Sequence, residues 1–140
     1  MTKKDGAGTE RNASVGRAPP HLRLSRADYV FEALRERRRR VICRILQTTD
    51  DREIEDLAMD VATHESDDDE RTVTNNEWEL VFASLYHSHI PKLDDLEVVT
   101  YDDTTGIVNP GPRFEPVADV LSAVERVLTV GDDFLPRSDE

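Results

Sequence analysis

Apolar residues recur at helical spacing in five stretches of this sequence, and a short segment rich in Val, Ile, Thr and Tyr lies between the fourth and the fifth. Apolar residues three and four positions apart cover one face of a helix, and that face must be buried against another element. We therefore expect a mainly α-helical domain with a small β-hairpin. The helices are expected at about 26–35, 37–48, 51–64, 75–93 and 116–128.

Local signals predict where these helices begin and where one of them is irregular. Residues 25–28 and 74–77 have the spacing of capping boxes, in which Ser or Thr is followed three positions later by an acidic residue. Asp50 or Asp51 is expected to cap the third helix. Pro91 lies inside the fourth stretch. Because proline lacks an amide hydrogen and crowds the preceding turn, it predicts altered geometry in that turn.

Residues 98–101 and 107–108 have the composition of paired strands, joined by a loop that contains Gly106. A two-stranded hairpin is not stable alone, so this one must lie against the helices. Four helices, a hairpin and a last helix make up the element order of a winged helix-turn-helix domain with an additional C-terminal helix. The expected organisation is a flexible tail (1–24), this domain (25–112), a C-terminal helix with a possible dimerisation face (113–130) and an acidic tail (131–140).

The charge balance is strongly acidic, because 30 Asp and Glu residues stand against 18 Lys and Arg residues and give a formal net charge of −12. At molar ionic strength, screening over about 3 Å removes most of the repulsion between carboxylates, and this composition is typical of halophilic proteins. No stretch approaches the ~20 apolar residues of a membrane span, so we expect a cytoplasmic protein. Cys43 lies in an apolar helical pattern and is expected to be a buried, inert thiol.

Three segments resemble a haloarchaeal family of small domains of uncharacterised function that are regarded as winged-helix domains. They are Arg37–Val41 (RRRRV), Leu85–Leu93 (LYHSHIPKL) and Val98–Asp102 (VVTYD), and the resemblance covers about Tyr29 to Val108. It implies a winged-helix fold, although that superfamily contains both DNA-binding and protein-binding members. One departure is Glu97, which stands where related regulators have glycine. If this position is left-handed, the side chain costs ~1 kcal/mol.

The strongest chemical feature of the sequence is an arginine segment, which consists of Arg35, Arg37, Arg38, Arg39, Arg40 and Arg44. Guanidinium groups pair bidentately with phosphate oxygens, so arginines retained in an acidic chain favour a phosphate-binding site. The alternative is a set of ion pairs with the acidic start of the third helix, at Asp51, Glu53, Glu55 and Asp56. The residues expected to contact phosphate are Arg37, Arg38, Arg39 and Lys92.

The fourth helix, at about Asn75 to Leu93, carries a second candidate site. Ser84, His87 and Ser88 lie opposite its apolar face, and short polar side chains at such positions can reach base edges in a major groove. The alternative is an ordinary solvated helix face, since Glu77 and Glu79 at the start of the helix repel phosphate.

Other chemistries find little support in this sequence. His87 and His89 point to different faces of a helix, so we expect no metal site, and His89 is expected in the core. Trp78, Phe82 and Tyr86 have helical spacing, which favours core packing over a stacking surface for bases. We find no nucleophile with a base and no glycine-rich phosphate loop, so we expect neither an enzyme nor a cofactor.

These observations favour a DNA-binding transcriptional regulator that binds double-stranded DNA as a homodimer. The hypothesis requires the arginine segment and the Ser84, His87 and Ser88 stripe to share one exposed surface beside the hairpin. The alternative is a protein-interaction adaptor without DNA binding, whose partner could contact the acidic loop Glu65–Glu70.

Overall fold

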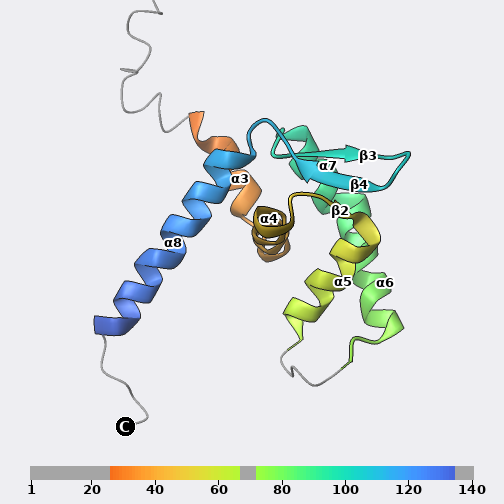
Figure 1. Ribbon diagram of the computed structural model, residues 1–140, viewed down its shortest axis with the longest axis horizontal. Coiled ribbons are helices and arrows are strands. Elements are labelled where there is room, and N and C mark those ends of the chain that lie inside the picture. Colours follow the sequence, from red (N-terminus) through yellow and green to blue (C-terminus); the bar gives the residue numbers. More distant parts are fainter. Residues whose placement is uncertain (1–25, 67–71, 135–140) are drawn as a thin grey trace, which may run out of the picture.

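The computed structural model describes residues 26–66 and 72–134 and confirms a mainly α-helical domain with a small β-hairpin and a C-terminal helix (Figure 1). The predicted tail at 1–24, the predicted cap Ser25 and most of the acidic loop lie outside the described residues. The elements are α3 (Asp28–Leu34), α4 (Arg37–Thr49), β2 (Arg52–Glu53), α5 (Ile54–Glu65), α6 (Asn75–Ser84), the π-helical turn η2 (Leu85–His89), α7 (Ile90–Asp95), β3 (Val99–Asp102), β4 (Ile107–Pro110) and α8 (Phe114–Phe134).

Helix α4 lies at the centre of the molecule, between α8 on one side and the α5–α6 pair on the other (Figure 1). Ile42 and Leu46 of its apolar stripe are fully buried, as their helical spacing predicts, and Ile45 is partly buried. Cys43 is also fully buried, and burial raises the pKa of its thiol to about 12. The expected inert environment of this cysteine is therefore confirmed.

The hairpin belongs to a three-stranded antiparallel sheet in the order β2-β4-β3. Val108 of β4 pairs with Tyr101 of β3 on one side and with Arg52 of β2 on the other. The short strand β2 corrects one prediction. Asp50 and Asp51 do not cap α5, because the chain first pairs with β4 and the helix then starts at Ile54, whose amide donates to the carbonyl of Gly106 at 2.8 Å.

The predicted irregularity near Pro91 is confirmed as the π-helical turn η2, which ends just before α7. The Ile90 amide donates to the Leu85 carbonyl, five residues back, instead of to the residue four back. Leu85 and Ile90 are both fully buried. In a regular α-helix five residues turn the chain by about 140° beyond a full circle, so the wider turn is what keeps both side chains on the core face.

Helix α7 ends in a hydrogen-bonded reversal that sets the direction of the hairpin. Val98 donates to the carbonyl of Leu93 at 2.9 Å and Glu97 donates to that of Asp94 at 2.9 Å, which is a Schellman motif. Glu97 has a φ of 66°, so the backbone here adopts the left-handed conformation that the glycine of related regulators indicated. A Cβ on nearby Gly111 would lie 2.6 Å from the Glu97 carbonyl oxygen, so glycine is required there.

Helix α8 begins at Phe114, with Pro116 in its first turn, and continues beyond the predicted end at 130 to Phe134. The first part of its apolar stripe, including Val117 and Leu121, is buried against α3 and α4. The second part projects past these helices (Figure 1). In the described residues we find no helix with the length and apolar character needed to cross a bilayer.

Candidate interaction surfaces

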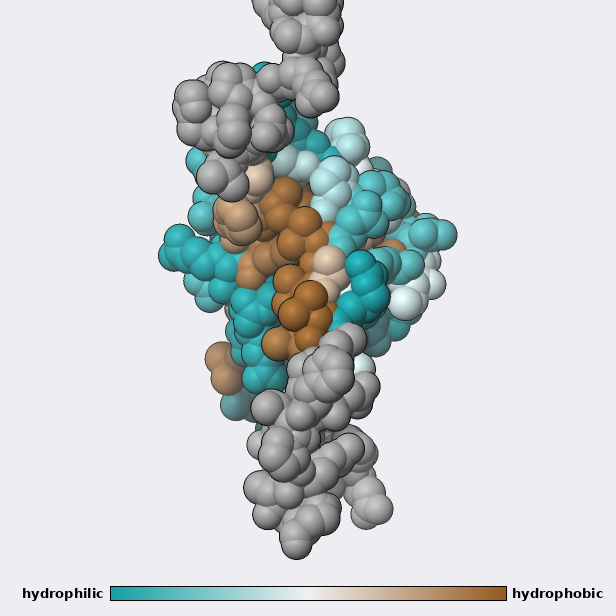
Figure 2. All heavy atoms as spheres, turned by 90° about the vertical axis from the view of Figure 1, so that its left-hand side faces the viewer, coloured by the Kyte–Doolittle hydropathy of each residue, from teal (hydrophilic) through white to brown (hydrophobic). Residues whose placement is uncertain are grey.

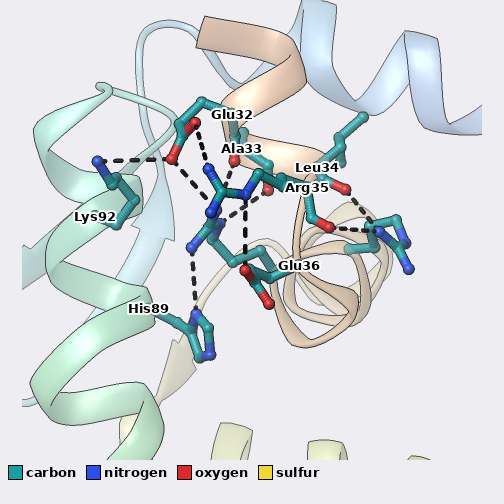
Figure 3. A network of polar contacts seen from close by, with 9 residues as sticks. Glu32, Ala33, Leu34, Arg35, Glu36, His89 and Lys92 are labelled. Atoms are coloured by element: carbon teal, nitrogen blue, oxygen red, sulfur yellow. Dashed lines mark hydrogen bonds and ion pairs between the residues drawn. The ribbon is translucent and has the colours of Figure 1, made fainter.

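Arg39 is buried inside the arginine segment, with 5% of its surface exposed. Its guanidinium donates to the carbonyls of Glu32, at 2.8 Å, and Ala33, at 3.3 Å, and lies 3.5 Å from Nδ1 of His89 (Figure 3). It therefore satisfies carbonyls at the C-terminal end of α3 and ties α3 to η2. This arginine was expected to contact phosphate, but its guanidinium is not exposed to an external ligand.

The other arginines of the segment differ in their contacts. Arg38 binds both carboxylate oxygens of Glu65, at 2.5 and 3.0 Å, and this hydrogen bonding raises the pKa of the guanidinium. Arg40 is exposed and donates to the carbonyls of Leu34 and Arg35, at 2.7 and 3.1 Å. The expected ion pairs thus exist in part, but Arg38 pairs with the C-terminal end of α5 rather than with its acidic start.

Arg35 lies near the carboxylates of Glu32 and Glu36, at 3.6 and 3.8 Å, whereas two other members of the segment lie toward α8. Arg44 pairs with Glu125 of α8, while Arg37 is exposed. Arg37, Arg40 and Arg44 line one open groove between α4 and α8, which has a volume of about 320 Å³. Lys92, the last predicted phosphate contact, lies 3.7 Å from a carboxylate oxygen of Glu32 (Figure 3).

The polar stripe of Ser84, His87 and Ser88 does not line the groove between α4 and α8. His87 and Ser88 are exposed and Ser84 is half-buried. These residues belong to α6 and η2, which pack on α5, whereas the arginine groove lies between α4 and α8 (Figure 1). Of the predicted phosphate contacts, Arg37 lines the groove between α4 and α8, whereas Arg38 lines a pocket with Glu77 and Leu80 of α6 and Lys92 lies on α7, which follows η2.

His89 points toward Arg39 instead of lying on the stripe (Figure 3), but it is only half-buried, so the prediction of a core histidine holds only in part. Burial lowers the pKa of its imidazole, and the positive charge of Arg39 lowers it further. The neutral ring can accept a hydrogen bond from Arg39 through Nδ1, whereas a protonated ring would repel that guanidinium.

A row of stacked aromatic rings follows α6 into η2 and reaches the hairpin. Trp78 stacks on Phe82 with centroids 5.2 Å apart, and Phe82 stacks on Tyr86 at 5.8 Å. Tyr86 then meets Tyr101 of β3 edge-on at 6.4 Å. Trp78, Phe82 and Tyr101 are partly buried against the core, while Tyr86 is 39% exposed. The prediction of core packing thus holds only in part.

Carboxylates border this aromatic row. The indole Nε1 of Trp78 donates to the backbone carbonyl of Glu55, the first acidic residue of α5, at 3.1 Å. Burial raises the pKa of Tyr101, and the negative charges of Asp103, Glu55 and Asp102 raise it further. We call this surface the acidic–aromatic face; it consists of Trp78, Phe82, Tyr86 and Tyr101 with Glu55, Asp102 and Asp103.

Sequence reasoning missed this face because its residues come from four separate elements, α5, α6, η2 and β3, and from the hairpin loop. The helical spacing of the aromatic residues was visible, but their approach to Tyr101 and Glu55 depends on how the hairpin packs against α5 and α6. No local pattern distinguishes the buried Arg39 from its exposed neighbours, since all four arginines at 37–40 are consecutive. The pairing of Glu65 with Arg38 is also a tertiary contact.

Comparison with known proteins places the central part of the chain in a family. No curated protein and no solved structure gave a significant match. A model of a domain of unknown function, DUF7344, matches residues 31–109, from the middle of α3 through most of the hairpin. The match spans more than half of the 140 residues, so the chain belongs to the DUF7344 family.

Proposed function

We propose that this chain is a winged-helix protein-interaction adaptor that uses the acidic–aromatic face to bind a cationic segment of a partner protein. The sheet order β2-β4-β3 with the α5–α6 pair before the hairpin supports the winged-helix assignment. The observation that carries the function is the row of four aromatic rings bordered by Glu55, Asp102 and Asp103.

The chemistry of this face fits a partner rich in arginine or lysine. A cation over an aromatic ring is attracted by about 0.5–2 kcal/mol, and neighbouring carboxylates add charge-assisted hydrogen bonds. The partly exposed Tyr86 offers such a ring, and the edge-on Tyr101 holds it in place. In a DNA complex the same carboxylates would repel phosphate.

The arginines support the same choice. A phosphate ligand would have to displace Glu65 from Arg38, and it cannot reach the buried Arg39 without opening the corner between α3 and α4. Breaking the ion pair of Arg38 with Glu65 costs free energy, whereas an unpaired arginine at the surface could bind phosphate without that cost. Arg37 is exposed but faces the α8 side, away from the hairpin.

Trp78 allows a direct test, because it is the sole tryptophan of the chain and lies on the proposed face. Titration with an arginine-rich peptide should change its fluorescence in a saturable manner. Tyr86→Ala should weaken binding at least about tenfold, because it removes both a cation–π contact and the contact area of the ring. The Glu55→Gln/Asp103→Asn double variant should also weaken it.

The matched control changes two exposed carboxylates on α8, Glu115→Gln and Asp119→Asn, and should leave the affinity unchanged. Equal weakening by both double variants would indicate non-specific attraction to an acidic chain and contradict the proposal. The titration is repeated at 0.1 and 1 M KCl, because stacking contacts persist when long-range charge effects are screened.

Direct DNA binding is the second candidate, and the exposed His87 and Ser88 on the outer side of η2 favour it. Neutral polar side chains there suit base-edge contacts. A gel-shift series with genomic DNA in molar KCl should show a complex that Ser84→Ala and His87→Ala weaken. A complex of that kind, together with no peptide binding, would make DNA the better supported partner.

A further inference from the structure

The arginine groove between α4 and α8 has a charge opposite to that of the acidic–aromatic face. It has a volume of about 320 Å³, and the C-terminal end of α5 also borders it (Figure 1). Arg37, Arg40 and Arg44 line the groove on α4, and Glu125 is the one carboxylate among its lining residues. The groove is therefore cationic, although the chain has a net charge of −12.

The position of Arg37 is not explained by contacts within the domain. It is exposed at the first position of α4, where the helix dipole disfavours a cation by about 0.3–1 kcal/mol. Arg38 and Arg39 offset such a cost through hydrogen bonds to Glu65 and to carbonyls of α3. In the part of the chain that the structure describes, the guanidinium of Arg37 has no hydrogen bond or ion pair. It can therefore bind an external anion without breaking a contact.

Arg40 also has donors available. It lies one turn further along α4 on the same side as Arg37, because residues three positions apart are neighbours on a helix. It is exposed, and its two hydrogen bonds to carbonyls at the end of α3 both use Nη1. Nε and Nη2 thus remain for a carboxylate. Arg44 pairs with Glu125, so the charge of the groove that is not neutralised lies on Arg37 and Arg40.

The wall that α8 contributes to the groove is largely apolar. Figure 2 shows apolar side chains gathered in one band on the side of the molecule that carries α8, with hydrophilic residues along both borders. Among the apolar residues of α8, Val124 and Leu128 are 48% and 62% exposed and line the groove, whereas the exposed Val127 does not. An apolar wall beside guanidinium groups that are not neutralised indicates a ligand with both apolar and anionic groups.

We propose that the arginine groove binds an acidic segment of a partner protein that carries bulky apolar side chains. In this complex its carboxylates pair with Arg37 and Arg40, and its apolar side chains cover Val124 and Leu128. The backbone of a nucleic acid offers phosphates but no apolar groups for the α8 wall, so it fits only one side of the groove. The proposal does not depend on the acidic–aromatic face, which attracts a cationic segment and repels an acidic one.

Fluorescence polarisation of the full chain with a short labelled peptide tests the proposal. The peptide alternates pairs of Asp with pairs of Leu and should bind in a saturable manner at 0.1 and 1 M KCl. Salt screens the long-range repulsion by the acidic chain more than it screens contacts inside the groove. Peptides with Asn in place of Asp, or Ser in place of Leu, should bind at least about tenfold more weakly. No saturable binding of the Asp–Leu peptide would overturn the proposal.

Matched variants of single residues locate the site. Arg37→Glu should weaken peptide binding at least about tenfold, and Arg126→Glu, at an exposed arginine of α8 outside the groove, should not. Glutamate in the first turn of α4 suits the helix dipole, so Arg37→Glu should keep the fold. Val124→Asp should likewise weaken binding at least about tenfold, and Val127→Asp should not. Circular dichroism checks folding, and equal weakening within either pair would overturn the proposal.

Other occupants of the groove give different results. If duplex DNA displaces the peptide, and its own binding is lost in Arg37→Glu but kept in Val124→Asp, the groove is a phosphate site and the proposal is wrong. Analytical ultracentrifugation of the parent chain tests a second copy as the occupant. Self-association that Arg37→Glu abolishes would assign the groove to another molecule of this chain and would also contradict the proposal.

Discussion

At Glu97 a single residue adopts a backbone conformation that suits glycine better. Its φ of 66° lies in the left-handed region, where a Cβ costs ~1 kcal/mol. We predict that Glu97→Gly raises the free energy of unfolding by up to about 1 kcal/mol. Glu97→Ala keeps the Cβ but loses the exposed pair with Arg113, at 3.6 Å, so it should be neutral or slightly destabilising. Urea denaturation measures both, and equal stability of the two variants would contradict the prediction.

His89 makes the stability of the domain depend on pH. Its pKa is lowered in the folded chain, first by burial and then by Arg39 and Arg38. The unfolded chain therefore binds a proton at a higher pH than the folded chain, so stability is complete above the unfolded pKa of about 6.5 and falls as the pH decreases through it. Urea denaturation midpoints should fall from pH 7.5 to 5.5.

The matched variant is His89→Gln, which has no titratable group at this position. It should be less stable than the parent chain at pH 7.5 but should lose less stability between pH 7.5 and 5.5. His87→Gln, at the exposed neighbouring histidine, should keep the parent slope. If His89→Gln has the same slope as the parent chain, another group is responsible.

At the scale of elements, periodicity and local signals predicted most of the fold. The capping box of Thr74 and Glu77 is present in both of its hydrogen bonds, and the hairpin strands lie where their composition placed them. Strand β2 was not predictable, because two residues carry no period and pair only once β4 is in place. The length of α8 was underestimated because its apolar stripe ends at Leu128, whereas the helix continues to Phe134.

The π-helical turn η2 gives a prediction about chain length. Deleting the exposed Ser88 would leave Leu85 and Ile90 four residues apart, so a regular α-helix would keep both in the core. We predict a folded deletion variant within about 1 kcal/mol of the parent chain, because a π turn is less favourable than an α turn. An added Ala after Ser88 would turn Ile90 out of the core and should cost at least 2 kcal/mol. Thermal denaturation and circular dichroism distinguish them, and an unfolded deletion variant would contradict this explanation.

At the scale of the whole molecule, the candidate sites were less predictable than the fold. The sequence placed Arg37–Arg40 and the Ser84, His87 and Ser88 stripe on helices correctly, but whether they share a surface depends on the packing of α4 against α5 and α8. The acidic–aromatic face arises in the same way, from rings and carboxylates that are distant in sequence. Arrangements between elements, rather than the elements themselves, set the chemistry of this surface.

The net charge of −12 should make the folded chain depend on salt. Like charges repel more strongly in the compact state than in the expanded unfolded chain, and KCl screens this repulsion over about 10 Å at 0.1 M and about 3 Å at 1 M. We predict that the thermal midpoint rises steadily between 0.1 and 2 M KCl. The Glu55→Gln/Asp56→Asn/Asp102→Asn/Asp103→Asn variant removes four exposed carboxylates and should have a higher midpoint at 0.1 M KCl and a smaller rise. The comparison separates screening from a general effect of salt on apolar burial, because the general effect would raise the thermal midpoints of both chains equally. If the midpoints of the two chains rise equally with KCl concentration, repulsion between these four carboxylates does not limit stability.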